Sequence, residues 1–324
     1  MESSGRESVH VPKIEICDSP SRDMIQEICC FVNSEADWNQ TVFDLEVADG
    51  TFAVARNTNN EIIGVSSSHA LSPRNLWLGN VCVAKTARRS GLASRLVNSL
   101  FDVAAEQRIR SHIVLLASKL GEGVYRRLGF RDVRSVAVAS YRRTSLPLPN
   151  FSTTVAGRPT AQEHDDAIRL EGEIGGSSRK ELLRKLFEKD NLCAVAKTDS
   201  SVVAAAWGRY KAPTPSTNEI TLHVGPVVAK TPDLAMRVVA ELLRMARADD
   251  ACASTSLPRA SALVVRIGDN KASEQVFESL GFEKAIDAPY LQKSIHDGAD
   301  PSPRDVDLAC ATDQCYATMW WDIA

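Results

Sequence analysis

The chain has 324 residues, of which 24% are charged and 44% hydrophobic, and its formal net charge at pH 7 is −3. This length suits two domains of ordinary size, each able to bury a core, and the composition excludes a wholly disordered chain. Because the basic residues are scattered and no apolar run reaches the length of a membrane span, we expect no nucleic-acid partner, no membrane partner, and a soluble protein of the cytoplasm.

A polar tail, residues 1–12, opens the chain and is expected to be disordered. A strand over Lys13–Cys17 follows it, and the sequence Asp18-Ser-Pro-Ser then provides cap residues for a helix. Further along, Thr51–Arg56 and Ile62–His69 are apolar or alternating and are separated by turn residues. This pattern predicts a β-hairpin.

The segment between that helix and the hairpin, residues 33–46, carries four carboxylates together with Trp38 and Asn39. Two interpretations stay open. The segment can be a solvated loop, as most such charged stretches are, or it can form one wall of a substrate mouth whose acidity suits a cationic amine. Under the second interpretation, Trp38 and Asn39 are candidate substrate-binding residues.

The most informative stretch, Leu78–Arg95, joins an apolar strand to a helix that begins near Leu92, through a basic turn that contains Gly91. Such a turn leaves backbone N–H groups unpaired at the positive end of the helix dipole, which makes a cradle for an anion. Arg88 and Arg89 add charge, and glycine permits a close approach. An ordinary strand-to-helix connection with solvated arginines is the alternative.

Beyond the cradle, a helix leads to Ile113–Ala117, whose fully apolar sequence is typical of a strand in the centre of a sheet. Ser118–Phe130 then predicts a helix that Gly129 closes in a left-handed conformation. Two prolines in residues 144–150, just after a strand that ends at Tyr141, indicate a linker.

The second half of the chain repeats the first. Asn270–Phe282 matches Ser118–Phe130 at six positions, Val83-Ala-Lys-Thr recurs as Val228-Ala-Lys-Thr, and the strand FAVAR recurs as CAVAK at Cys193–Lys197. Because the three segments keep their order, the sequence predicts two copies of one fold.

The copies differ where a ligand would bind. In the second, the turn after Thr231 is about three residues shorter, lacks glycine, and has Asp233 where Arg88 stands. A carboxylate there would repel a pyrophosphate. Phe277 also replaces Tyr125, which removes a hydroxyl group. Since the fold forms without these features, we interpret them in the first copy as ligand chemistry rather than architecture.

Two motifs of the first copy together resemble a known family. The spacing V-x-x-x-x-R-x-x-G-x-A is carried by Val83, Arg88, Gly91 and Ala93, and Tyr-x-x-x-Gly-Phe begins at Tyr125. In this order they resemble the acyl-coenzyme A loop and the following helix of the GNAT N-acetyltransferases. With a degenerate second copy, the chain is similar to tandem GNAT proteins of the YitH type.

The resemblance implies an α+β fold class: two α/β sandwiches, each with a mixed, mainly antiparallel sheet flanked by helices. The expected domains are a tail (1–12), a GNAT domain with the acetyl-coenzyme A site (13–143), a linker (144–150), and a degenerate GNAT-like domain with an acceptor-side or structural role (151–324). The segment Cys315–Ile323 could supply a last strand.

The resemblance also implies acetyl-coenzyme A as cosubstrate, no metal, and direct attack by an amine in a ternary complex. Tyr125 would be the general acid that protonates the departing thiolate. The cofactor-binding positions would be Val81, Cys82, Val83, Arg88, Arg89, Ser90, Gly91, Leu92, Ala93 and Ser118.

The general base is less well defined, because no Glu or Asp lies on the strand 77–83. His69 is the nearest titratable candidate, and a hydrogen-bonded strand histidine is the alternative. Cys82 could suggest a covalent intermediate, but no histidine motif accompanies it, and the eight cysteines form no C-x-x-C pair. Free thiols in a reducing compartment explain them better.

Three functions remain open at this point. The first is acetylation of a primary amine on a small molecule. The second is a non-catalytic acyl-coenzyme A sensor or scaffold, which a missing base would permit, and the third is a protein or peptide N-acetyltransferase. A homodimer is also compatible with the sequence.

Overall fold

A computed structural model describes most of the chain. The described residues are 12–36, 50–70, 75–106, 112–142, 155–175, 180, 183–184, 192–198, 201–211, 220–252, 261–267, 270–295 and 315–318. Residues 1–11 of the predicted tail (1–12) and the linker at 144–150 therefore lie outside them, and so do Trp38 and Asn39. The proposed domain boundaries stay a prediction.

The same order of elements occurs twice. The first half contains β1 (Ile14–Cys17), α1 (Arg22–Ala36), β2 (Thr51–Arg56), β3 (Ile62–Ala70), β4 (Asn75–Val83), the 3-10 helix η1 (Lys85–Ala87), α3 (Leu92–Glu106), β5 (His112–Leu116), α4 (Glu122–Arg127) and β6 (Arg131–Arg142). The second half contains β7 (Val155–Gly157), α5 (Ala161–Gly175), β8 (Leu192–Lys197), β9 (Val202–Lys211), β10 (Thr221–Ala229), α7 (Pro232–Cys252), β11 (Ser261–Ile267), α8 (Lys271–Ser279), β12 (Glu283–Ser294) and β13 (Cys315–Thr318). The internal repeat and the last strand at Cys315 are confirmed.

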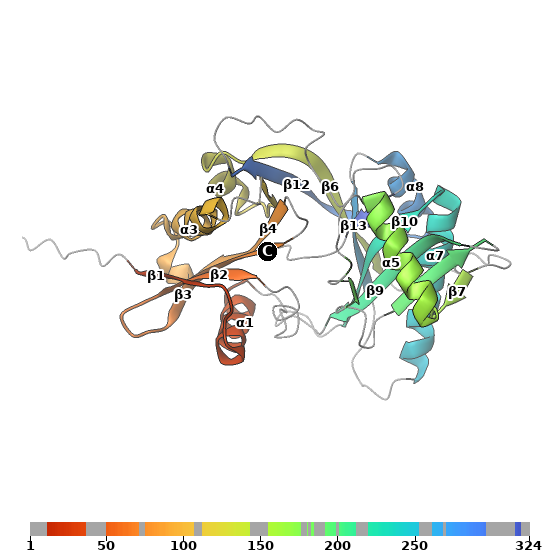
Figure 1. Cartoon of the computed structure of the whole chain (residues 1–324), viewed down its shortest axis with the longest axis horizontal. Coiled ribbons are helices and arrows are strands. Elements are labelled where there is room, and N and C mark those ends of the chain that lie inside the picture. Colours follow the sequence, from red (N-terminus) through yellow and green to blue (C-terminus); the bar gives the residue numbers. More distant parts are fainter. Residues whose placement is uncertain are drawn as a thin grey trace, which may run out of the picture.

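The strands form one continuous sheet in the order β1-β2-β3-β4-β5-β12-β6-β11-β13-β10-β9-β8-β7. The pairs β4–β5 and β10–β11 are parallel, whereas the other pairs are antiparallel, so the expected mixed, mainly antiparallel sheet is confirmed. Figure 1 shows the two halves on either side of the long strands β6 and β12.

The two halves exchange the strands that follow α4 and α8, which are β6 and β12. β12 of the second half lies between β5 and β6 of the first, with Gln292 opposite Val114. In return β6 pairs with β11 of the second half, with Ser140 opposite Leu263. Each half therefore completes its sheet with a strand from the other, and ladders of backbone hydrogen bonds join them.

Helices cover both faces of the first half (Figure 1). α3 and α4 bury one face in a cluster that includes Leu96, Ile113 and Tyr125, and α1 covers part of the other face with Ile28 and Val32. In the second half, α7 and α8 pack on the sheet around Val238 and Phe277 among other apolar residues. Alternating strand residues face the two layers, as a sheet covered on both sides requires.

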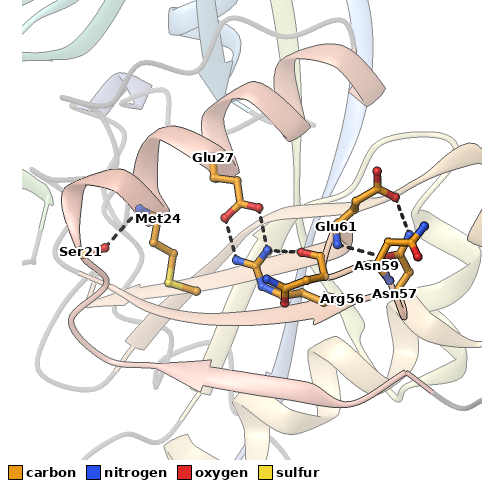
Figure 2. Close-up of polar contacts among 8 residues, drawn as sticks. Ser21, Met24, Glu27, Arg56, Asn57, Asn59 and Glu61 are labelled. Carbon is orange, nitrogen blue, oxygen red and sulfur yellow. Dashed lines mark hydrogen bonds and ion pairs between the residues drawn. The ribbon is translucent and has the colours of Figure 1, made fainter.

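An ion pair fixes α1 to the hairpin. Arg56 Nη1 and Nη2 each donate to one carboxylate oxygen of Glu27, both at 2.7 Å, as Figure 2 shows. At the start of the helix, Ser21 Oγ accepts the N–H of Met24 at 3.3 Å. Asn57 Oδ1 accepts two backbone N–H groups in the hairpin turn, at 2.9 Å each. The predicted helix cap and hairpin turn are therefore both present.

The Arg56–Glu27 pair is expected to stabilise the chain by less than about 1 kcal/mol, because the two side chains are 21% and 45% exposed. The hydrogen bond from Arg56 lowers the pKa of Glu27. The contribution is therefore present above the unfolded pKa of glutamate and is lost as the pH falls through the lower folded pKa. Urea unfolding of wild type, Glu27→Gln, Arg56→Met and the double variant at pH 7 and pH 3 measures it. A coupling energy of equal size at both pH values would contradict the assignment.

Candidate functional site

The parallel strands β4 and β5 part in the middle of the first half. They pair only over Asn75–Trp77 and His112–Val114. Beyond Trp77, β4 pairs with β3 alone among the described residues, and the register of that pair shifts between Val65 and Ser67. The parting leaves the β5-facing edge of Val81–Val83 without a strand partner in the described part of the chain, so this edge can bind an extended ligand by backbone hydrogen bonds.

The cradle lies where β4 leads through η1 into α3. Arg89 and Gly91 both have positive φ, 64° and 81°, and a Cβ built on Gly91 would meet no atom within 4 Å. The glycine therefore suits the left-handed conformation, and its outer side is open. The N–H groups of Leu92 and Ala93 precede the first helical hydrogen bond, from Arg95 N to Gly91 O at 3.2 Å. These groups are suited to binding an anion.

The side chains of Arg88 and Ser90 hold the loop itself. Arg88 Nε donates to Val83 O at 3.0 Å, and its Nη2 donates to the backbone oxygen of Glu35 at 3.3 Å. Ser90 Oγ donates to Ala87 O at 2.7 Å. In this conformation the Arg88 guanidinium links the end of β4 to α1, so its contribution to the cradle is largely structural.

Tyr125 and Ser118 belong to the second motif. Ser118 Oγ accepts the N–H of Gly121 at 3.1 Å at the entry to α4. The ring of Tyr125 packs edge-on against Phe130, with centroids 5.7 Å apart. Burial raises the pKa of Tyr125 above its usual range, which keeps the phenol protonated and able to donate. Gly129 has φ 88° at the end of α4, as predicted.

His69 belongs to a buried chain of polar groups that reaches the irregular part of β4. Ser67 Oγ donates to Gly79 O at 3.2 Å and accepts from Asn80 Nδ2 at 3.1 Å, while His69 Nε2 lies 2.9 Å from the same hydroxyl. Because the Ser67 hydrogen goes to Gly79, this network assigns the imidazole hydrogen to Nε2. On its other side, a Cβ on Gly50 would lie only 2.1 Å from His69 Nδ1. The imidazole is therefore enclosed.

Cys82 is buried beneath α1, beside Val65. Burial raises the pKa of its thiol to about 11. At neutral pH the group is therefore a thiol and a poor nucleophile, which agrees with the expected absence of covalent chemistry at this residue.

Neither a metal group nor a membrane span is found in the described residues. No group of three or more histidine, cysteine, aspartate or glutamate side chains among them could hold a metal ion. Within the same residues, no helix combines the length and apolar character needed to cross a membrane.

The second half lacks the corresponding cradle. Residues 84–91 connect β4 to α3, whereas only residues 230 and 231 connect β10 to α7, so this turn is shorter by six residues rather than by about three. The sequence comparison missed the difference because α7 begins directly at Pro232. Proline supplies no N–H, and the carboxylate of Asp233 follows it.

The opening between β10 and β11 is filled in the second half. After the pair Val224–Val264, β13 enters between the two strands, with Ala317 opposite both Val227 and Arg266. The chain's own last strand therefore takes the place that stays open between β4 and β5. Phe277 also stands where the first half has Tyr125. The second half therefore lacks both the opening and the hydroxyl group of the first.

Comparison with known proteins agrees with this description. Residues 19–130 match the model of the acetyltransferase (GNAT) family. The fold is similar to that of a Pyrococcus horikoshii protein assigned to the acetyltransferases, with a TM-score of 0.70, 14% identity and coverage of 98% of this chain and 99% of that one. It is also similar to a tandem GNAT protein from the clavulanic acid biosynthesis pathway, with a TM-score of 0.66, 11% identity and coverage of 89% and 100%.

A third solved structure, a GCN5-related N-acetyltransferase from Sphaerobacter thermophilus, has a TM-score of 0.60, 13% identity and coverage of 89% of this chain and 98% of that one. Because the sequence identities are low, these three solved structures show a shared fold alone. The comparison with curated proteins found no significant match. The first half of the chain therefore matches the acetyltransferase (GNAT) family over residues 19–130, and the second half repeats the fold of the first.

Sequence reasoning missed the polar side chains on the face that α1 partly covers. Ser67 was not considered as a site residue, nor were Tyr290 and Gln292 of β12. The run Ser66-Ser-Ser-His69 was an available signal, because several polar residues inside a buried strand need hydrogen-bond partners. For the residues of β12, no local signal connected them with the first half.

Proposed function

We propose that this protein is an N-acetyltransferase that binds one acetyl-coenzyme A in its first domain and transfers the acetyl group to a primary amine, on a small molecule, within a ternary complex. The observation that carries the proposal is the open edge of β4 next to the α3 N-terminus. The match of residues 19–130 to the acetyltransferase (GNAT) family supports acyl transfer from acyl-coenzyme A to an amine.

The residues present fit such a cosubstrate. The N–H groups at the start of α3, with Gly91 leaving space in front of them, would bind the pyrophosphate. The edge at Val81–Val83 would hydrogen-bond the extended pantetheine arm, and a backbone N–H there would polarise the thioester carbonyl. Arg88 would hold this edge in a fixed position relative to the cradle through its hydrogen bond to Val83 O.

Tyr125 would donate its hydroxyl hydrogen to the departing sulfur, since its raised pKa keeps the hydrogen in place. His69 stays the candidate base. In the assigned tautomer it donates to Ser67, so accepting a proton from the amine would require the other tautomer, with Ser67 relaying the proton. Its alternative role is to orient Ser67 and Asn80.

One molecule of acetyl-coenzyme A is expected to bind per chain. β13 fills the second opening, and the shortened turn with Pro232 and Asp233 provides no cradle there. Isothermal titration of the full chain with acetyl-coenzyme A measures the stoichiometry. Two sites per chain would contradict the assignment of the second half, and no binding would overturn the proposed function.

Release of free thiol from acetyl-coenzyme A in the presence of a panel of primary amines then tests for transfer. Thiol release that depends on an amine supports the enzyme. Binding of acetyl-coenzyme A without thiol release for any amine would instead favour an acyl-coenzyme A sensor.

A further inference from the structure

One row of residues crosses four neighbouring strands of the first domain. His69, Trp77, Val114 and Gln292 are register partners on β3, β4, β5 and β12. Register partners point to the same face of a sheet. Their chain neighbours Leu76 and Ile113 belong to the cluster under α3 and α4, so the row lies on the opposite face.

Two side chains of this row carry buried polar atoms without a hydrogen bond. Gln292 is 1% exposed, and neither its Oε1 nor its Nε2 has a partner in the described part of the chain. Trp77 is 6% exposed, and the same holds for its Nε1. Burying such groups unpaired destabilises a protein, so their presence calls for an explanation, such as a ligand that pairs with them.

The row lies at the parting of β4 and β5. Trp77 and Val114 form the last pair before the two strands separate. Two residues before Gln292 on β12, Tyr290 lies opposite Leu116, and its ring centroid is 6.1 Å from that of Trp77. Because α3 and α4 cover the other face, the row lies on the face of the sheet that these helices leave for an acceptor.

We infer that Gln292 and Trp77 bind the amine acceptor, so that the second half of the chain supplies part of the acceptor site of the first domain. The inference rests on the proposed function. Gln292 Nε2 and Trp77 Nε1 donate, Gln292 Oε1 accepts, and both side chains are neutral. They fit a carboxamide or peptide amide better than a carboxylate, which would face Oε1 unfavourably, and the Trp77 and Tyr290 rings fit an apolar or aromatic part beside it.

Three related amines test this chemistry: phenylalaninamide, phenethylamine, which lacks the carboxamide, and phenylalanine, which carries a carboxylate. With the concentration of each acceptor counted as its neutral amine, kcat/KM for phenylalaninamide in wild type is expected to exceed that for each of the others at least about tenfold. Gln292→Met should bring the ratio of kcat/KM for phenylalaninamide to that for each of the other two amines close to one. It should leave the Kd for acetyl-coenzyme A unchanged. It should also raise Tm, because it removes the unpaired amide.

Two further variants separate a binding role from a structural one. Trp77→Phe keeps an aromatic ring but removes Nε1, and should lower the preference for phenylalaninamide. Lys293→Met changes the neighbouring residue of β12 on the opposite face, where Lys293 Nζ lies 4.3 Å from the centroid of the Phe101 ring, and should leave the preference unchanged. A preference that survives Gln292→Met overturns the inference.

Binding measurements distinguish failure of the inference from failure of the proposed function. If phenylalaninamide neither reacts with nor binds to wild type loaded with coenzyme A, while acetyl-coenzyme A binds normally, the inference is wrong and the proposed function stands. If acetyl-coenzyme A itself does not bind, the proposed function is wrong, and so is the inference that rests on it.

Discussion

Gly91→Asp is expected to weaken acetyl-coenzyme A binding at least about tenfold more than Gly91→Asn does. Both residues tolerate the positive φ of 81° at this position, and both project into open space, so they differ mainly in charge. A carboxylate in front of the α3 N-terminus would meet the pyrophosphate directly. Two unit charges 4 Å apart near a protein surface interact with an energy of about 4 kcal/mol. A third of this energy already corresponds to a change of about tenfold in affinity.

Isothermal titration of the two variants gives the comparison, and their Tm values show whether the fold is kept. We expect both to melt slightly below wild type, because only glycine adopts this conformation without strain. The difference between the two Kd values should shrink as salt is added. Equal affinity for acetyl-coenzyme A in both variants would mean that the pyrophosphate does not bind at Gly91.

Tyr125→Phe is expected to lower kcat about 100-fold and to leave the Kd for acetyl-coenzyme A nearly unchanged. The hydroxyl would interact with the sulfur only as it departs, so its removal affects the transition state more than the bound cosubstrate. The ring would keep its packing against Phe130. Since burial raises the pKa of Tyr125, ionisation of the phenol should not reduce the wild-type rate between pH 7 and pH 10.

The matched control is Phe277→Tyr, which adds the hydroxyl at the equivalent position of the second half. It should not change kcat, because that half lacks the cradle and its opening is filled by β13.

The pH profile of kcat/KM for His69→Gln tests the assignment of the general base. Loss of the acidic limb would support the base role of His69, and an unchanged limb would exclude it. Full activity of Tyr125→Phe with a reactive amine would show that another group protonates the sulfur.

Much of the fold followed from local patterns. The hairpin of β2 and β3, the apolar strand β5 and the helix closed by Gly129 were all predicted from residue spacing and turn chemistry. The repeat could be recognised because helix-ending and strand-starting residues recur in one order. The length of the turn before α7 was wrong by about three residues, since Pro232 allows a helix to start at once.

The candidate site could be predicted only in part. The N–H groups of the cradle and Gly91 follow from a strand, a turn and a helix that are adjacent in sequence. The engagement of Arg88 with Glu35 could not be read locally, because it joins the loop to α1 across more than fifty positions. The same is true of the bonds that connect Asn80 with Ser67.

The sequence by itself determined that the chain holds two copies of one fold and that only the first has the basic turn with Gly91, because helix caps, turn residues and strand periodicity act over short distances. Only the tertiary structure decided that β12 and β6 exchange places and that β13 closes the second opening. Pairing between distant strands depends on register, and a shift by one residue turns every side chain to the other face. That register places Gln292 of the second copy in the row of Trp77, within the acceptor site that we infer for the first.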